Sequence, residues 1–269
     1  MTDAFHAFEH AGWQRAASAY PDTFGQVTLQ AVEPLLDAVG AGPGVRLLDI
    51  ATGPGYVAAA ATRRGANATG IDFAPAMVEH ARQLHPGLDI REGDALNLPF
   101  DAATFDAAVA GFVLLHVDEP ERALAEMRRV LRPGGRGAFT VWMAPEHTAG
   151  FRITLDAIAK HGDTESPAPP GPPFFRFSDP RECERALLAA GFTSPKVIEV
   201  PMTWRLPSGD ALFEAMAEGG VRTSALLNAQ SPKARAAIRS TMITEVASFI
   251  RDAEVVLPMP CVLASAVAR

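Results

Sequence analysis

Residues 45–55 read VRLLDIATGPG, and this stretch decides the fold of the chain. An apolar run of the right length for one buried strand ends at the acidic Asp49, and a tight turn containing Gly53 and Gly55 follows. The alanine-rich residues 56–64 then have the pattern of a helix. A strand, a Gly-rich turn and a helix bring backbone N–H groups and a helix N-terminus against a nucleotide-like ligand. Because similar turns also serve dinucleotides, phosphates and plain tight packing, this stretch alone leaves the ligand open.

A second acidic residue follows the next predicted strand, residues 67–71. Asp72 stands at the carboxyl end of that strand, 17 positions after Gly55. A carboxylate there faces the same crevice as the Gly-rich turn and can accept both hydroxyl hydrogens of a ribose. The alternative is a helix cap, since Pro75 suits a first helical position. The two roles are compatible, and ribose contact is the favoured interpretation.

Strand and helix patterns alternate through the first half of the chain. Strands are predicted near residues 45–50, 67–72, 88–91, 104–111 and 135–142, with helices between them. Such alternation predicts a parallel sheet covered on both faces, with ligands outside the carboxyl ends of its strands. The Pro-Gly-Gly sequence at 133–135 predicts a helix stop and the start of the fifth strand.

The Gly-rich turn departs from the nicotinamide fingerprint Gly-x-Gly-x-x-Gly, because Ala51 and Ala58 occupy its first and last positions. Three further motifs follow in order: GDALNLPF at 93–100, TFDAAVAGF at 104–112 and LAEMRRVLRPGG at 124–135. The ordered set resembles the class I S-adenosylmethionine-dependent methyltransferases. It is most similar to the ubiquinone/menaquinone-biosynthesis branch, closely over about residues 35–142 and loosely elsewhere.

The resemblance implies a doubly wound, seven-stranded Rossmann-like α/β sheet with six parallel strands. The last strand would be antiparallel and lie between the fifth and sixth, and a helical cap would be added. The implied cofactor is S-adenosyl-L-methionine, with S-adenosyl-L-homocysteine as product. The family usually has glycine where this chain has Ala51, so we expect a slightly shifted loop and an intact site.

The same resemblance assigns cofactor contacts residue by residue. Asp49, with Ala51, Thr52, Gly53 and Gly55, would lie beside the methionyl part, and Asp72 would bind the ribose. Phe73 and Met77 would flank the adenine, Asp94 would accept from its amino group, and the Ala95 N–H would reach a ring nitrogen. Ala110, Gly111 and Phe112 would close over the methionine end, with His116 architectural or on the cofactor side.

The whole chain, residues 1–269, is predicted to be one methyltransferase domain. Its parts are an N-terminal helical segment (1–44), a cofactor-binding core (45–142), a helix with a Pro-rich loop (143–177) and a helical cap insertion (207–254). After the core, the patterns predict helices at 150–160, 180–191, 209–218 and 232–252, and strands at 195–206 and 256–267.

Composition excludes several classes of protein. The 48% hydrophobic and 20% charged content is ordinary for a globular protein, and a net charge of −7 argues against a nucleic-acid substrate. No apolar run is long enough to span a bilayer, and residues 1–10 lack the pattern of a secretion signal. Cys183 and Cys261 cannot form a disulfide framework or a metal cluster, so we predict a cytoplasmic protein.

Methyl transfer from a sulfonium is an in-line displacement that needs proximity, alignment and a dry cavity, and a general base helps when the acceptor is a hydroxyl or an acidic carbon. Among the base candidates, His147 is preferred because it follows the fifth predicted strand at its carboxyl edge. The other candidates are His6, His10, Tyr20, His161 and Glu214. The histidines are scattered and no carboxylate pair has ligand spacing, so no metal site is predicted.

The predicted acceptor is a small, apolar or aromatic metabolite. Its pocket would be enclosed by the N-terminal segment, the Pro-rich loop and the insertion, and lined by Trp13, Tyr20, Phe174, Phe175 and Phe177. Alternatively, these aromatics only pack the cap. Two other functions stay open: a nicotinamide-dependent oxidoreductase and a non-catalytic S-adenosylmethionine-binding protein. The sequence names neither the acceptor nor the oligomeric state.

Overall fold

The computed structural model describes residues 2–269, and they form two compact units. The sheet unit comprises residues 28–142, 171–200 and 261–269. The helical unit comprises the described residues up to Val27 together with 143–170 and 201–260. Each unit is described by itself.

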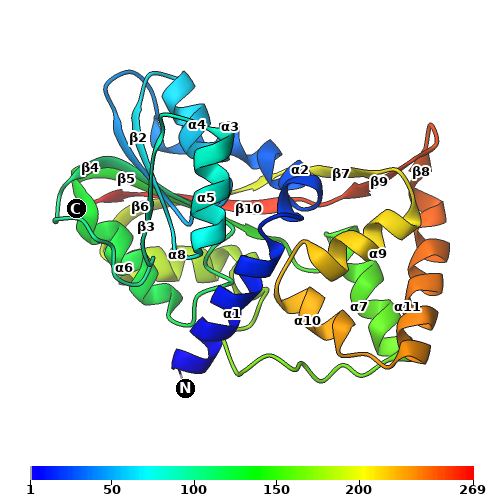
Figure 1. The fold of residues 1–269 in the computed structure, drawn as a ribbon. Helices are drawn as coiled ribbons and strands as arrows, with labels where there is room; N and C mark the ends of the chain where they lie inside the picture. Colours follow the sequence, from blue (N-terminus) through cyan, green and yellow to red (C-terminus); the bar gives the residue numbers. More distant parts are fainter. Residues whose placement is uncertain (1) are drawn as a thin grey trace. The chain divides into compact units, whose positions relative to one another are not determined.

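The sheet unit contains a seven-stranded sheet of order β3-β2-β1-β4-β5-β10-β6 (Figure 1). Neighbouring strands from β3 to β5 are parallel, whereas β10 runs antiparallel to both β5 and β6. This order confirms the predicted fold class, including the antiparallel last strand between the fifth and sixth. The strands are β1 (Arg46–Ile50), β2 (Asn67–Asp72), β3 (Asp89–Glu92), β4 (Phe105–Gly111), β5 (Leu131–Trp142), β6 (Phe192–Val200) and β10 (Cys261–Ala268).

The direction of the crossovers determines which helices share a face of the sheet. The connections from β1 to β2 and β3 run one way across the sheet, and the connection from β4 to β5 runs the other way. Because such crossovers are right-handed, their helices lie on opposite faces, and the direction reverses between β1 and β4. Ligands of doubly wound sheets bind outside the carboxyl ends at this reversal. The helices are α3 (Val32–Val39), α4 (Tyr56–Arg63), α5 (Pro75–Leu84), α6 (Pro120–Val130) and α8 (Pro180–Ala189).

The central strands are buried on both faces, as expected of a covered parallel sheet. Leu47 and Leu48 of β1 are fully buried, and so are Ala107 and Ala108 of β4, which pair with them. In β5, the close approach of α6 to the sheet requires a residue without a side chain. A Cβ added at Gly137 of β5 would lie 2.8 Å from the Phe192 ring and 3.0 Å from a sulfur on α6.

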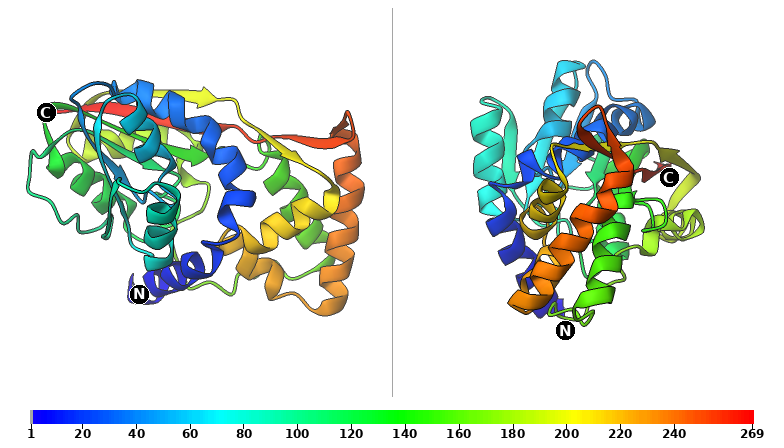
Figure 2. Two further views of the ribbon diagram at one scale, coloured as in Figure 1. Left: turned by 45° about the horizontal axis from the view of Figure 1, so that its top comes forward. Right: turned by 90° about the vertical axis from the view of Figure 1, so that its right-hand side faces the viewer.

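The helical unit combines five helices with a small sheet of order β7-β9-β8. Helices α7 and α9 both pack against α11 (Figure 2). The ring of Phe24 lies 4.9 Å from that of Trp204 and 5.9 Å from that of Phe151, and these rings are buried. The elements are α1 (Thr2–Ala16), α7 (Ala149–His161), α9 (Gly209–Glu218), α10 (Arg222–Asn228), α11 (Pro232–Glu245), β7 (Thr203–Leu206), β8 (Ile250–Arg251) and β9 (Glu254–Pro258).

Five shorter segments complete the chain. They are a short helix α2 (Gly25–Thr28) and four single 3₁₀ turns, η1 (Tyr20–Asp22), η2 (Leu29–Ala31), η3 (Arg176–Ser178) and η4 (Val246–Phe249).

The two strands predicted at 195–206 and 256–267 are wrong as single strands. The first divides into β6 and β7 and the second into β9 and β10, and the two parts of each belong to different sheets. Both breaks contain a proline, Pro201 and Pro260, which cannot donate to a strand ladder. Across these breaks, the N–H of Met259 donates to the carbonyl of Met202 at 2.9 Å.

Two other predicted boundaries are also wrong. The helix predicted at 232–252 ends at Glu245, and the chain continues through η4 into the β8–β9 hairpin, where Asp252 and Ala253 have φ of 49° and 69°. The fifth strand begins at Leu131, before the predicted position 135, because residues 132–135 form an irregularity in its pairing with β4. Gly134, with φ of 79°, permits that irregularity.

Among residues 2–269, no helix is long and apolar enough to cross a lipid bilayer.

We expect Gly137→Ala to destabilise the chain, because its new methyl group would overlap the Phe192 ring 2.8 Å away. Overpacking of this kind costs about 1–3 kcal/mol in the free energy of unfolding. Urea unfolding followed by circular dichroism measures it. Gly42→Ala is the matched control, since nothing lies within 4 Å of a Cβ there. Equal stability of the two variants would contradict the close packing at β5.

Candidate functional site

Asp49 is buried at the end of β1 and binds the loop that follows it. Asp49 is only 1% exposed. Its Oδ2 accepts a hydrogen bond from the Thr52 hydroxyl at 2.6 Å and another from the Ala58 N–H at 3.0 Å. The residue that precedes α4 is Gly55, which has no side chain to cap the helix. Asp49 therefore supplies from β1 the acceptor that the first turn of α4 lacks.

Asp72, at the end of β2, binds backbone on both sides of itself. Its Oδ2 accepts from the Gly53 N–H at 2.9 Å, and its Oδ1 accepts from the Ala74 N–H at 3.0 Å. Ala74 is the N-cap residue of α5. Asp72 thus links the Gly-rich loop to the start of α5, and the capping role and the crevice position coexist. Contact with a ribose stays a prediction.

The Gly-rich loop takes three left-handed residues to make its turn. The φ angles are 54° at Ala51, 52° at Gly53 and 82° at Gly55. A Cβ in this region is strained, so the alanine costs conformational energy at a position where glycine is favoured. The Thr52 N–H donates to the carbonyl of Ile71 at 2.7 Å and holds the loop against β2.

Burial shifts the pKa of both carboxyl groups upward. The pKa of Asp49 is raised to about 7, chiefly by desolvation, and the hydrogen bonds from Thr52 and Ala58 oppose this shift. The nearby Asp72 carboxylate raises it further. Desolvation likewise raises the pKa of Asp72 to about 6, although the hydrogen bonds from the N–H groups of Ala74 and Gly53 lower it. No lysine or arginine among residues 2–269 contributes to either shift. Two buried carboxylates without a counter-cation favour a proton or a cationic ligand.

The residues predicted to surround the adenine lie at the ends of β2 and β3. Met77 in α5 and Ala95 are buried, and Phe73 is half-buried. Asp94 accepts from the Leu96 N–H through Oδ1 at 2.8 Å, and the preceding N–H of Gly93 donates to the Asp72 carbonyl at 2.9 Å. The structure therefore brings the Asp94 turn directly beside the end of β2.

The carboxyl end of β4 forms the third part of the site. Ala110 and Gly111 end the strand, and Phe112 follows with φ of 56°. The Phe112 ring lies 4.4 Å from the ring of Trp142 at the end of β5. Sequence reasoning missed Trp142 as a site residue, although its place at the end of the predicted fifth strand could have indicated it.

The aromatic residues before α8 divide into two groups. Phe174 and Phe175 are half-buried with ring centroids 4.8 Å apart, and the Phe174 ring stands edge-on, 5.9 Å from the His116 ring. Phe177 is only 3% exposed and packs edge-on against Phe139 of β5 at 6.0 Å. Phe177 therefore contributes to the core of the sheet unit, whereas Phe174 packs against His116 and Phe175 packs against Phe174.

The other predicted residues lie in the helical unit, and their roles stay predictions. The rings of Trp13 and Tyr20 are 5.7 Å apart and edge-on, and His147 is exposed in the turn before α7. His161 Nε2 lies 2.8 Å from the Thr241 hydroxyl, and Glu214 pairs with Arg239 at 3.1 Å. His6 and His10 are half-buried on α1. Within the part of the chain that the structure describes, no three acidic, histidine or cysteine side chains gather as a metal site.

The strand order, with the antiparallel β10 inserted next to the edge strand, is the order that the resemblance to Rossmann-like methyltransferases implied. Acidic residues stand near the end of β1, at the end of β2 and after β3. Residues 48–139 match the family model of the methyltransferase domain. The match covers less than half of the chain, and together with the curated relatives it confirms the predicted resemblance of these residues to the class I S-adenosylmethionine-dependent methyltransferases of the ubiquinone/menaquinone-biosynthesis branch.

Individual proteins support the same family. The chain is 42% identical over 102 residues to a demethylmenaquinone methyltransferase of Renibacterium salmoninarum, which covers 38% of this chain and 43% of that protein. The chain therefore spans less than half the length of this curated relative.

Solved structures share the fold at low sequence identity. The YcgJ protein of Bacillus subtilis has a TM-score of 0.58 at 18% identity, covering 89% of this chain and 98% of that one. A Haemonchus contortus phosphoethanolamine N-methyltransferase in complex with S-adenosyl-L-methionine has a TM-score of 0.52 at 18% identity, covering 88% and 51%.

We expect the free energy of unfolding to fall as pH rises through neutrality. A carboxyl group whose pKa is higher in the folded chain than in the unfolded chain binds its proton preferentially in the folded state. The stability from Asp49, with its pKa near 7, is therefore lost between its unfolded pKa near 4 and about pH 7. Between about pH 5.5 and 8 this one group should cost the folded chain ~2 kcal/mol.

Urea unfolding of the wild type and Asp49→Asn at these two pH values checks the expectation. The variant should lose most of the pH-dependent difference, whereas Asp89→Asn, which removes an exposed ion pair with Arg91, should keep it. The same pH dependence in the wild type and Asp49→Asn would contradict the assignment.

Proposed function

We propose that the chain is an S-adenosyl-L-methionine-dependent methyltransferase that acts on a small, apolar or aromatic metabolite. The observation that carries the proposal is the pair of buried carboxylates, Asp49 and Asp72, which hold a Gly-rich loop and to whose pKa shifts no lysine or arginine of residues 2–269 contributes. A ligand with a sulfonium, an ammonium group and ribose hydroxyls offers positive charge and donors to such a site. The family match of residues 48–139 supports this choice of ligand.

In this proposal the carboxyl ends of three neighbouring strands bind different parts of the cofactor. Asp49 and the loop after β1 would face its methionyl part, and Asp72 would accept from its ribose hydroxyls. Asp94 and the Ala95 N–H would recognise the adenine, between Phe73 and Met77. Ala110, Gly111 and Phe112 would close the methionine end.

The cofactor, when bound, supplies a methyl group on a sulfonium, whose leaving group is a neutral thioether. The chain's own residues then need to bind, orient and exclude water. The Phe112–Trp142 ring pair, 4.4 Å apart, can keep water from the reacting centre. The relative from Renibacterium salmoninarum is a demethylmenaquinone methyltransferase, so a quinol is one candidate acceptor. His147 is the candidate base for an acceptor hydroxyl.

The two other functions make different demands. A nicotinamide-dependent oxidoreductase would need a Gly-rich phosphate-binding turn, whereas Ala51 and Ala58 occupy the first and last glycine positions of that fingerprint. A non-catalytic S-adenosylmethionine-binding protein would keep the cofactor site and lack turnover. Thermal shift with S-adenosyl-L-methionine and with NAD(H) distinguishes a methyltransferase from the oxidoreductase. Release of S-adenosyl-L-homocysteine in the presence of a candidate quinol or other aromatic acceptor distinguishes a methyltransferase from the non-catalytic binding protein.

We expect Asp72→Ala to weaken S-adenosyl-L-methionine binding roughly tenfold to a hundredfold, because two charge-assisted bonds to the ribose would be lost. Isothermal titration calorimetry measures the Kd. Because Asp72 also holds the N–H groups of Gly53 and Ala74, Asp72→Asn is the second variant, which keeps one acceptor oxygen. Asp89→Ala on β3 is the control and should bind as the wild type does. Unchanged affinity in folded Asp72 variants would refute the assignment.

We expect Phe175→Ala to lower turnover of the acceptor while the affinity for S-adenosyl-L-methionine stays near that of the wild type. The physical reason is that Phe174 and Phe175 offer an aromatic surface near His116, and apolar ligands bind such surfaces. Steady-state kinetics with an accepted substrate, and calorimetry with the cofactor, measure the two effects. Leu188→Ala, at an exposed apolar residue of α8, is the control. Wild-type kinetics in Phe175→Ala would leave these rings with a packing role only.

A further inference from the structure

The turn that carries Asp94 is anchored at both of its ends. At its start, the Gly93 N–H donates to the Asp72 carbonyl at 2.9 Å. Within it, the Asn97 N–H donates to the Asp94 carbonyl at 3.1 Å, and Asp94 Oδ1 accepts from the Leu96 N–H. The second anchor is Leu98, which is 3% exposed. The position of the Asp94 carboxylate therefore depends on what holds Leu98.

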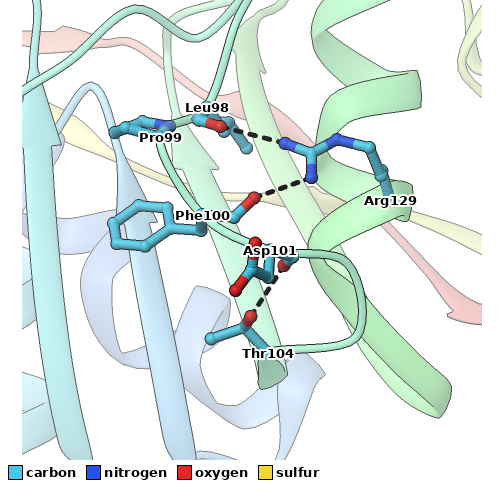
Figure 3. A pocket seen from close by; sticks show the side chains of 6 residues that line it. All are labelled: Leu98, Pro99, Phe100, Asp101, Thr104 and Arg129. Carbon is cyan, nitrogen blue, oxygen red and sulfur yellow. Dashed lines mark hydrogen bonds between the residues drawn. The ribbon is translucent and has the colours of Figure 1, made fainter.

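An ion pair on α6 holds both polar backbone groups of Leu98. Glu126 Oε2 accepts from the Leu98 N–H at 2.9 Å, and Arg129 Nη2 donates to the Leu98 carbonyl at the same distance. Arg129 Nη1 also donates to the Phe100 carbonyl at 2.7 Å (Figure 3). The Glu126 carboxylate and the Arg129 guanidinium thus act as the acceptor and the donor for Leu98, as the backbone groups of a neighbouring strand would.

The two side chains are fixed to one another by two bonds. Arg129 Nε and Nη2 each donate to a different oxygen of Glu126 at 2.7 Å. Such a forked, charge-assisted pair has one geometry and leaves little freedom to either side chain. The same arginine holds the pKa of Glu126 below its usual range. The two side chains are 36% and 18% exposed, and their remaining groups all bind backbone of residues 98 and 100, which fits a role in positioning that loop.

Glu119, the N-cap residue of α6, and Arg122 form a second glutamate–arginine pair of the same spacing. Arg122 lies 3.5 Å from Glu119, also three residues apart, and both side chains are about half exposed. Neither has a hydrogen bond to residues 93–100 among those that the structure describes. A substitution of Arg122 therefore reports the effect of losing an arginine–glutamate pair, and the same substitution of Arg129 reports in addition the effect on the Asp94 turn.

We propose that Glu126 and Arg129 are positioning residues. They hold the backbone of the Asp94 turn in place, so that the Asp94 carboxylate can recognise the adenine base. The inference rests on the proposed function, in which Asp94 binds the cofactor. The pair acts through Leu98 and has no contact with the ligand itself. A shallow depression lined by Arg129, Asp101, Thr104 and residues 98–100 exposes one side of this anchor (Figure 3).

The test compares Arg129→Lys with Arg122→Lys in the full-length chain. Lysine keeps the charge but cannot bind Glu126 and two carbonyls with one fork. Calorimetry measures the Kd of S-adenosylhomocysteine and of its inosyl analogue, which lacks the adenine amino group. We expect Arg129→Lys to weaken adenosyl binding by about fivefold to tenfold and inosyl binding less. The adenosyl preference should therefore shrink, and Arg122→Lys should preserve it.

Glu126→Gln is the second variant, in case Arg129→Lys does not fold. It removes the charge of the pair and should also reduce the adenosyl preference. If a folded variant at either position has a lower melting temperature but the wild-type ratio of the two Kd values, the pair is structural and the inference is wrong. If the wild type binds neither ligand, the proposed function fails first, and the inference fails with it.

Discussion

The constraint on which this candidate site depends is the burial of two carboxylates, Asp49 and Asp72, to whose pKa shifts no lysine or arginine of residues 2–269 contributes. Water stabilises a carboxylate far better than a protein interior does, so each buried charge must be compensated by donors. The fold supplies them from its own backbone: the amides of Gly53 and Ala74 to Asp72, and the amide of Ala58 with the Thr52 hydroxyl to Asp49. These bonds give the Gly-rich loop its shape. The conformation of the loop is therefore a consequence of the two acids.

The same constraint explains why the surrounding strands end where they do. Asp49 lies in β1 among the buried Leu47, Leu48 and Ile50, and Asp72 ends β2 after the buried Gly70 and Ile71, so the parallel pairing of the two strands carries both carboxylates to one edge of the sheet. The left-handed conformations at Gly53 and Gly55 then turn the chain back toward α4. Ala51, two residues after Asp49, also has a positive φ and is therefore strained. Strain of this kind persists where the neighbouring structure determines the backbone.

Much of the sheet unit could be predicted from sequence, because its strands are apolar runs that end in turns with glycine or proline. The parallel strands, the helices between them and the acidic residues at the strand ends follow from such local patterns. The breaks at Pro201 and Pro260 could not, because an apolar run that changes sheets has the same composition as one long strand. The anchoring of Leu98 by Glu126 and Arg129 was also hidden, since residues about 30 positions apart meet only after the helix has packed. The place of Phe177 in the core depends on Phe139, which no local pattern indicates.

The helical unit is assembled from three separate stretches of chain, the first before residue 28, the second after 142 and the third after 200. No continuous segment of the chain consists of this unit alone, so a fragment that contains all of it also contains most of the sheet unit. Its core, where Phe24, Phe151 and Trp204 meet, closes loops of more than a hundred residues and so pays a large entropy of closure. Contacts of such long sequence separation form slowly. During synthesis, the first of the three stretches must therefore wait for most of the chain before it finds its partners.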